Sequence, residues 1–140
     1  IKKDLPKKIY IDRGDSISNV AKLRTIVNEK EVKDFLKKKG FTSMRLSDLH
    51  FLDQVQLFNE ADYIVGLHGA AFANMVFCKQ KTKVLELKNT TADKVIENLA
   101  HTNDLNFSSI MCEPIAFNFS NQLGHIKVPI NVLDEKIKNL

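Results

Sequence analysis

The chain has 140 residues, with 21 Lys and Arg against 17 Asp and Glu, and therefore a formal net charge of +4. Its 44% hydrophobic residues suffice for the core of one domain, while a 27% charged fraction with only five glycines and three prolines excludes collagen-like, low-complexity or wholly disordered material. No segment approaches the ~18 consecutive apolar residues of a membrane span.

The basic residues give little indication of nucleic-acid binding, because all but Arg13, Arg24 and Arg45 are lysines. The densest run, residues 37–39, closes an amphipathic helix, where cations complement the helix dipole on a solvated face. We therefore expect no nucleic-acid partner.

The cysteines and histidines form no metal motif. Cys78 and Cys112 lack C-x-x-C spacing and follow apolar stretches, so free, buried thiols of a reducing compartment are expected. The four histidines show neither an H-E-x-x-H motif nor an i, i+4 pair. We expect no metal site.

The first third of the chain predicts a strand, a helix and a second strand. Residues 8–12 form a β-branched and aromatic run that ends in loop residues. Apolar side chains at helical spacing predict a helix over residues 28–39, which Gly40 ends. Residues 41–46 indicate the second strand.

The middle of the chain continues the alternation. A helical stripe from about residue 51 to Ala61 has Asp48 as a candidate cap, and residues 62–66 follow as the third strand. The small residues that come next predict a turn that opens a short helix, which continues to about Phe77.

The last third predicts a fourth strand at residues 83–87, a helix over residues 92–100 behind a Thr91 cap, and a fifth strand at residues 107–112. Residues 113–124 show no period and are expected to form a loop, and apolar spacing predicts a terminal helix after it.

Strands separated by helices of about ten residues predict an α/β, doubly wound, Rossmann-like parallel sheet of about five strands. The strand order 2-1-3-4-5 would make the first and third strands neighbours, whereas the order 3-2-1-4-5 would separate them. The chain starts without Met and without a signal peptide, so we expect a piece of a longer protein.

Ligands bind such sheets at the carboxyl ends of the strands, beside the point where the strand order reverses. Arg13 follows the first strand, with Arg24 on the same connection, and His68, Gly69 and Ala70 follow the third strand directly before a helix. Small residues let backbone N–H groups approach an anion, the helix dipole favours negative charge, and arginines add fixed positive charge. This pattern predicts a phosphate site, with a plain helix cap and two solvated arginines as the alternative.

Two further polar residues lie near these strand ends. Asn74, one helical turn after Ala70, either stabilises the loop or contacts a ligand. Glu86, expected at the end of the fourth strand, either accepts two hydrogen bonds from ribose or is a surface carboxylate that caps the next loop. The absence of G-x-G-x-x-G, P-loop and G-x-S-x-G motifs disfavours NAD, P-loop and serine-nucleophile chemistry.

A series of short fragments in this sequence resembles glycosyltransferase family 61, and their order and spacing hold from residue 7 to residue 87 and more loosely to residue 140. The fragments are Lys8-Ile9-Tyr10-Ile11 with Arg13, Arg24 before Asn28-Glu29, Gly40-Phe41, Gln54, Ala61-Asp62, His68-Gly69-Ala70 with Asn74, and Val84-Leu85-Glu86-Leu87. Three positions depart from the family pattern: Asp12 replaces Ser, Leu23 replaces the first of two Arg, and Ala71 replaces Gly. The first two departures alter the detail of the anion clamp.

The resemblance implies an inverting GT-B glycosyltransferase of two Rossmann-like halves, which transfers a sugar from a nucleotide donor to a glycan acceptor. Such enzymes usually need no metal, and bacterial members serve capsule or surface polysaccharide biosynthesis. Residues 8–140 would be the C-terminal, donor-binding domain, and residues 1–7 a linker from a missing N-terminal half.

The resemblance also implies roles for single residues in binding the donor, expected to be a UDP-sugar without any cofactor. Arg13 and Arg24 would neutralise the phosphates, and Glu86 would hold the ribose. The remaining members of the donor site would be His68, Gly69, Ala70 and Asn74.

No residue is a convincing base for the acceptor hydroxyl, so the base is expected in the missing half and this piece alone should be inactive. The expected location is cytoplasmic, with peripheral association at the inner face of a bacterial membrane. The alternative function is a nonenzymatic nucleotide-binding or regulatory, flavodoxin-like module. Its mark would be an acidic cluster at the end of the first strand, where Asp12 and Asp15 are the only nearby acids.

Overall fold

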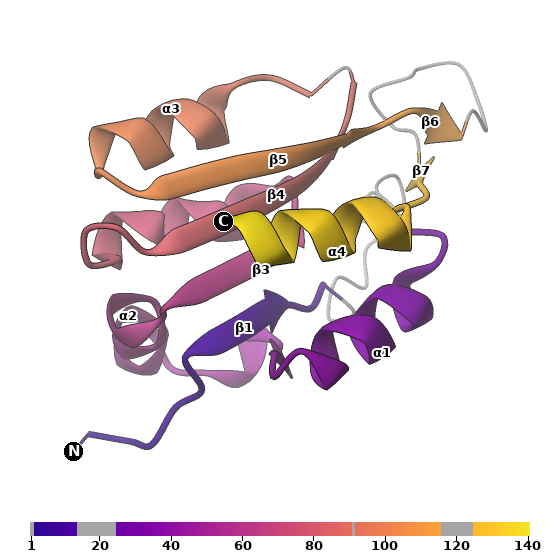
Figure 1. Ribbon diagram of the computed structural model, residues 1–140. Helices are drawn as coiled ribbons and strands as arrows, with labels where there is room; N and C mark the ends of the chain where they lie inside the picture. The colour runs from indigo at the N-terminus through magenta and orange to yellow at the C-terminus, as the bar shows by residue number, and fades with distance from the viewer. Residues whose placement is uncertain (1, 14–24, 91, 116–124) are drawn as a thin grey trace.

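A computed structural model of the protein describes residues 2–13, 25–90, 92–115 and 125–140 (Figure 1). Five strands form a parallel sheet with the order β2-β1-β3-β4-β5. They are β1 (Lys8–Ile11), β2 (Thr42–Met44), β3 (Tyr63–Leu67), β4 (Lys83–Asn89) and β5 (Asn106–Cys112). The predicted class and strand order are confirmed, and the alternative order is wrong because β1 pairs directly with β3.

Helices cover both faces of the sheet, as Figure 1 shows. One face packs against α1 (Glu29–Lys38) and α4 (Ile130–Asn139). The other packs against α2 (Phe51–Glu60), the 3₁₀ helix η3 (Ala70–Phe77) and α3 (Val95–Thr102). The arrangement is doubly wound, as the sequence predicts.

Two hydrophobic cores result from the alternation of side chains along each strand. In β3, Val65 points to the face of α1 and α4, whereas Ile64 points to the face of α2, η3 and α3. In β4, Leu85 and Val84 divide in the same way, and all four side chains are fully buried. Each such side chain contributes roughly 1.5–3 kcal/mol to stability.

The end of α1 follows its sequence signals. Gly40 has φ +90°, a left-handed conformation that glycine adopts without steric cost, and the Gly40 N–H donates to the carbonyl of Lys37. The Lys8 ammonium donates to the carbonyl of Lys39 at 2.6 Å. Lys37 and Lys38, in the last turn of α1, add positive charge at the same end, where it complements the helix dipole.

Several element boundaries differ from the predictions. Asp48 does not cap α2: it ends a separate 3₁₀ turn, η2 (Leu46–Asp48), and α2 begins after His50. The α3 helix begins at Val95, three residues late, because the Asp93 carboxylate accepts from the Val95 N–H, and Thr91 lies outside the described residues.

The expected loop over residues 113–124 is partly wrong. Within it, β6 (Pro114–Ile115) pairs antiparallel with β7 (His125–Ile126), and residues 116–124 lie outside the described part. Ile126 also forms a bridge with Ile26, just before α1. The Asn28 side chain donates to the carbonyl of Val128 and accepts from its N–H, so it fastens the start of α1 to the chain leading into α4.

The described N-terminal residues contact α2. The Lys3 ammonium lies 2.7 Å from the Asp53 carboxylate, and the Gln56 amide exchanges hydrogen bonds with the Lys3 backbone. In the described ranges, no helix has the length and apolarity that crossing a bilayer requires.

Candidate strand-end site

The carboxyl ends of β1 and β3 lie side by side, with Ile11 paired to Gly66 in the ladder. Arg13 comes two residues after β1, and His68 follows β3 directly. The Arg13 guanidinium donates to the carbonyl of His68 at 3.3 Å. The structure thus brings these two predicted residues to one edge of the sheet, while Arg24 lies outside the described residues.

Gly69 leaves room for the Arg13 side chain. A Cβ at Gly69 would lie 3.0 Å from Nη1 of Arg13, which is closer than nearly all ordinary contacts. The φ of Gly69 is 164°, an extended conformation open to any residue, so proximity and not backbone strain makes glycine suitable here. Ala70 begins η3, where the first N–H groups of a helix have no acceptor within it.

A second glycine seats η3 against the sheet. A Cβ at Gly66 would lie 3.1 Å from Cζ of Phe72 and 3.3 Å from Cβ of Ile11. Phe72 is fully buried, so the ring occupies space that a larger residue in β3 would take. The turn at residues 68–69 is therefore held between a packed helix and the strand end.

His68 and Glu86 form a close pair: Nδ1 of the imidazole hydrogen-bonds Oε2 of the carboxylate. Glu86 is fully buried and pairs with Gly66 in the β3–β4 ladder, and β4 continues past it to Asn89. Glu86 is therefore neither at the end of its strand nor a surface carboxylate. Its role in holding the ribose stays a prediction.

Two residues that sequence reasoning missed complete this cluster. Lys88 is only 2% exposed; its ammonium lies 3.6 Å from Oε1 of Glu86 and 3.5 Å from the carbonyl of Asp93. The exposed Asp93 carboxylate lies 3.8 Å from Nε2 of His68. Alternation could have found Lys88, because residues two apart on a strand share a face.

A second charged group lies at the end of β1. The buried Asp12 carboxylate is 2.7 Å from the Lys33 ammonium and 3.6 Å from Nε of Arg45. A regulatory module would carry an acidic cluster here, formed by Asp12 and Asp15. Two cations neutralise Asp12, and Asp15 lies outside the described residues. Charge balance therefore does not support a regulatory acidic site.

Asn74 contacts another helix. Its amide donates to Oε1 of Gln54 at 3.2 Å, and Gln54 in turn donates to the carbonyls of Leu46 and Leu49. These bonds fasten η3 to α2 and to the turn before it. Asn74 thus stabilises this part of the fold, and its predicted contact with the donor stays a prediction.

The cysteines of the chain are free, and burial raises the pKa of the Cys78 thiol to about 12 and also raises the pKa of Cys112. Among the described residues, no three His, Cys, Asp or Glu side chains lie close enough together to hold a metal ion.

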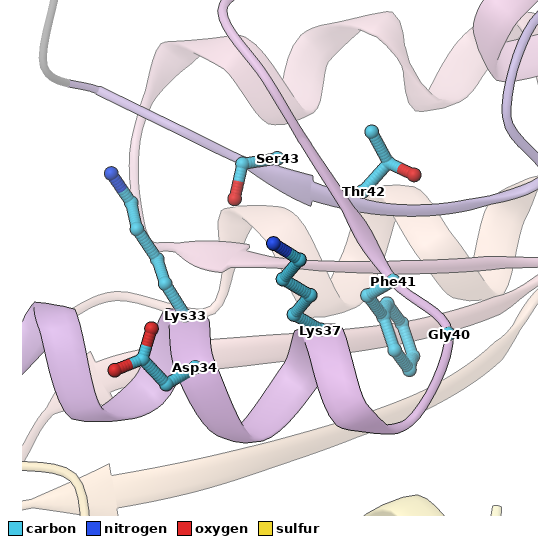
Figure 2. Close-up of a pocket in the computed structure, with 7 residues that line it drawn as sticks. All are labelled: Lys33, Asp34, Lys37, Gly40, Phe41, Thr42 and Ser43. Carbon is cyan, nitrogen blue, oxygen red and sulfur yellow. The ribbon is translucent and has the colours of Figure 1, made fainter.

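A groove of about 510 Å³ lies away from the His68 cluster, between α1 and the edge strand β2 (Figure 2). Lys33 and Lys37 extend from α1 toward Thr42 and Ser43 of β2. Lys33 is engaged by Asp12, so this groove begins beside the strand-end charges and runs along the edge of the sheet.

Comparison with known proteins shows the family of the chain. The family model described as Glycosyltransferase 61 matches residues 1–85, which is more than half of the chain. The chain belongs to glycosyltransferase family 61.

Two similar relatives carry the name EGF domain-specific O-linked N-acetylglucosamine transferase. The mouse protein is 28% identical over 89 residues, covering 60% of this chain and 17% of the relative. The rat protein is 30% identical over 82 residues, covering 55% of this chain and 16% of the relative. The chain therefore spans about a sixth of the length of the curated relatives that it matches.

Proposed function

We propose that this domain binds the nucleotide diphosphate of a sugar donor at the carboxyl ends of β1 and β3, within a glycosyltransferase. The observation that carries the proposal is the position of Arg13. Its guanidinium lies against the bare Gly69 backbone at the start of η3 and donates to the His68 carbonyl. In a family of sugar-transferring enzymes, a fixed cation beside free helix N–H groups fits a leaving diphosphate.

Each part of this arrangement has a chemical role in the proposal. The Arg13 guanidinium supplies a permanent positive charge and a fork of hydrogen-bond donors. The N–H groups of Gly69 and Ala70 would donate to the phosphate oxygens, because Gly69 has no side chain to keep the phosphate away. Arg24, on the same connection, is proposed as a second cation. Together they stabilise the negative charge that develops as the sugar leaves, without a metal ion.

The relatives support a choice of sugar and acceptor. Their name specifies N-acetylglucosamine and an EGF domain. We therefore propose a UDP-linked N-acetylglucosamine donor and a protein hydroxyl as acceptor, in preference to a capsular or surface polysaccharide. The remaining length of the protein would supply the N-terminal half and with it the acceptor site.

Calorimetry of the full-length protein with UDP, in buffer containing a chelator, tests the donor site. A charge-assisted hydrogen bond contributes roughly 1.5 to 3 kcal/mol, so Arg13→Ala should weaken UDP binding by about 10- to 150-fold. The matched control is Lys79→Ala, which removes one positive charge from an exposed pair at the opposite end of the sheet.

Two results would count against the proposal. Equal affinity of the wild type and Arg13→Ala would remove Arg13 from the site. Equal losses in Arg13→Ala and Lys79→Ala would show that net charge, and not a phosphate contact, governs binding. Transfer to an isolated EGF domain, compared with a capsular polysaccharide, tests the acceptor separately.

A further inference from the structure

The proposed role of Arg13 in nucleotide binding does not explain why His68, directly after β3, hydrogen-bonds a fully buried acid. His68 is 13% exposed in its side chain, whereas Glu86 has no exposed surface. We propose that His68 is the base that deprotonates the acceptor hydroxyl and that Glu86 is its positioning residue. This inference rests on the proposed glycosyltransferase function.

The first step of the argument is the direction of the His68–Glu86 hydrogen bond. The Lys88 ammonium lies 3.6 Å from Oε1 of Glu86, and Lys88 is itself almost fully buried. Lys88 and Glu86 form a buried ion pair, and the carboxylate of an ion pair only accepts hydrogen bonds. Nδ1 of His68 must therefore carry the proton that it shares with Oε2.

The second step concerns the other ring nitrogen. A neutral imidazole with a proton on Nδ1 has a lone pair on Nε2, so Nε2 accepts a proton and cannot donate to a phosphate. Nε2 lies 3.8 Å from the carboxylate of Asp93, an exposed residue. The geometry favours a base over a member of the diphosphate cradle.

The third step is the balance of the reaction. Nε2 takes the proton of the acceptor hydroxyl as the acceptor oxygen forms its bond to the anomeric carbon. The bond from that carbon to the diphosphate oxygen breaks, and its electron pair leaves with the diphosphate beside Arg13. The imidazolium that results lies between the Glu86 and Asp93 carboxylates, which stabilise its charge.

Kinetics of the full-length protein test the role of His68. The probes are UDP for binding and UDP-N-acetylglucosamine for turnover, with an EGF domain or water as acceptor. His68→Gln should lower kcat by at least about 100-fold while the Kd for UDP changes by less than about threefold. The matched control, His101→Gln, alters the histidine in the last turn of α3 and should change neither quantity.

A pH profile and a second variant separate positioning from structure. The charged groups around the ring are Glu86 and Lys88 on β4, Asp93 after it, and Arg13 at the His68 carbonyl. The wild-type kcat should fall at low pH as the imidazole takes up a proton, and this limb should vanish in His68→Gln. Glu86→Gln keeps the size of the side chain but leaves the buried Lys88 ammonium unpaired, so folding is checked first; in the folded protein it should lower kcat at least about tenfold without weakening UDP binding.

Nitrogen-15 NMR of the imidazole gives a readout that needs no turnover. The neutral ring of His68 should carry its proton on Nδ1 in the wild type, and Glu86→Gln should change this tautomer. A proton on Nε2 would overturn the inference, as would His68→Gln with normal kcat. Loss of UDP binding in His68→Gln would instead make His68 a donor contact. Failure of the wild type to bind UDP would overturn the proposed function itself, whatever the tautomer shows.

Discussion

The two ends of the sheet use charge in opposite ways. At the amino ends of β3, β4 and β5, Asp62 pairs with Lys79 and Asp104 pairs with Lys81, and all four side chains are about half exposed or more. In the carboxyl half of β4, by contrast, Glu86 and Lys88 are buried.

This difference indicates that the buried charges in the carboxyl half of the sheet are not explained by stability alone. Exposed ion pairs contribute only about 0–1 kcal/mol. Buried charges lose hydration, and their mutual attraction only offsets that loss, so apolar residues of similar size would hold the fold as well or better. A buried charged cluster is therefore poorly explained by stability alone, which supports the proposed catalytic role of His68 and Glu86.

The largest effect is expected when one charge of the buried Glu86–Lys88 pair is removed. Lys88→Met leaves the Glu86 carboxylate buried without its cation, and we expect a loss of about 3–5 kcal/mol in the free energy of unfolding, measured by urea denaturation. The double variant Glu86→Leu with Lys88→Met removes both charges and should recover most of this loss. If the double variant is no more stable than Lys88→Met, the two residues are not coupled as the structure shows.

The fold was largely predictable because its causes are local and repetitive. Short β-branched and aromatic runs identified the strands, helical stripes identified α1 and α2, and right-handed crossovers limited the topology to a few strand orders. The choice between two orders required tertiary information, since no local pattern shows that β1 pairs with β3.

The charged cluster was harder to predict, because its members contradict their ordinary preferences. Lys88 and Asn89 have the composition of a loop, yet β4 extends through both, with Lys88 buried because Glu86 lies two residues before it. Asp93 was expected within the helix over residues 92–100, but it lies before α3, and its carboxylate accepts from the Val95 N–H. Local propensity fails where long-range pairing between charged residues decides the structure.

A smaller effect is expected from a change at the site that leaves both charge clusters intact. Gly69→Ala places a methyl group about where the Arg13 guanidinium lies, and the flexible arginine must shift. We expect UDP to bind about three- to tenfold more weakly, corresponding to roughly 1 kcal/mol, with an unchanged urea midpoint because the Gly69 backbone is extended.

Gly69→Val is the stricter version of this test, since its branched side chain also blocks approach to the Gly69 N–H. It should abolish transfer in a preparation that remains folded. Normal turnover and donor affinity in folded Gly69→Val would mean that the diphosphate does not lie at this turn.

The smallest effect is expected at the amino end of the sheet. The hydrogen bond and charge of Lys79 lower the pKa of the Asp62 carboxyl, and the Asp62 side chain is more than half exposed, so solvent screening weakens the interaction. Because the pKa of folded Asp62 lies below its unfolded value, the stabilisation is present above about pH 4 and disappears as the pH falls through the folded pKa. Asp62→Asn should therefore cost less than about 1 kcal/mol at pH 7 and still less at pH 2. Urea unfolding of both proteins at the two pH values measures this difference. A loss at pH 7 as large as that of Lys88→Met would show that the two ends of the sheet do not differ in the way described, because an exposed pair would then matter as much as a buried one.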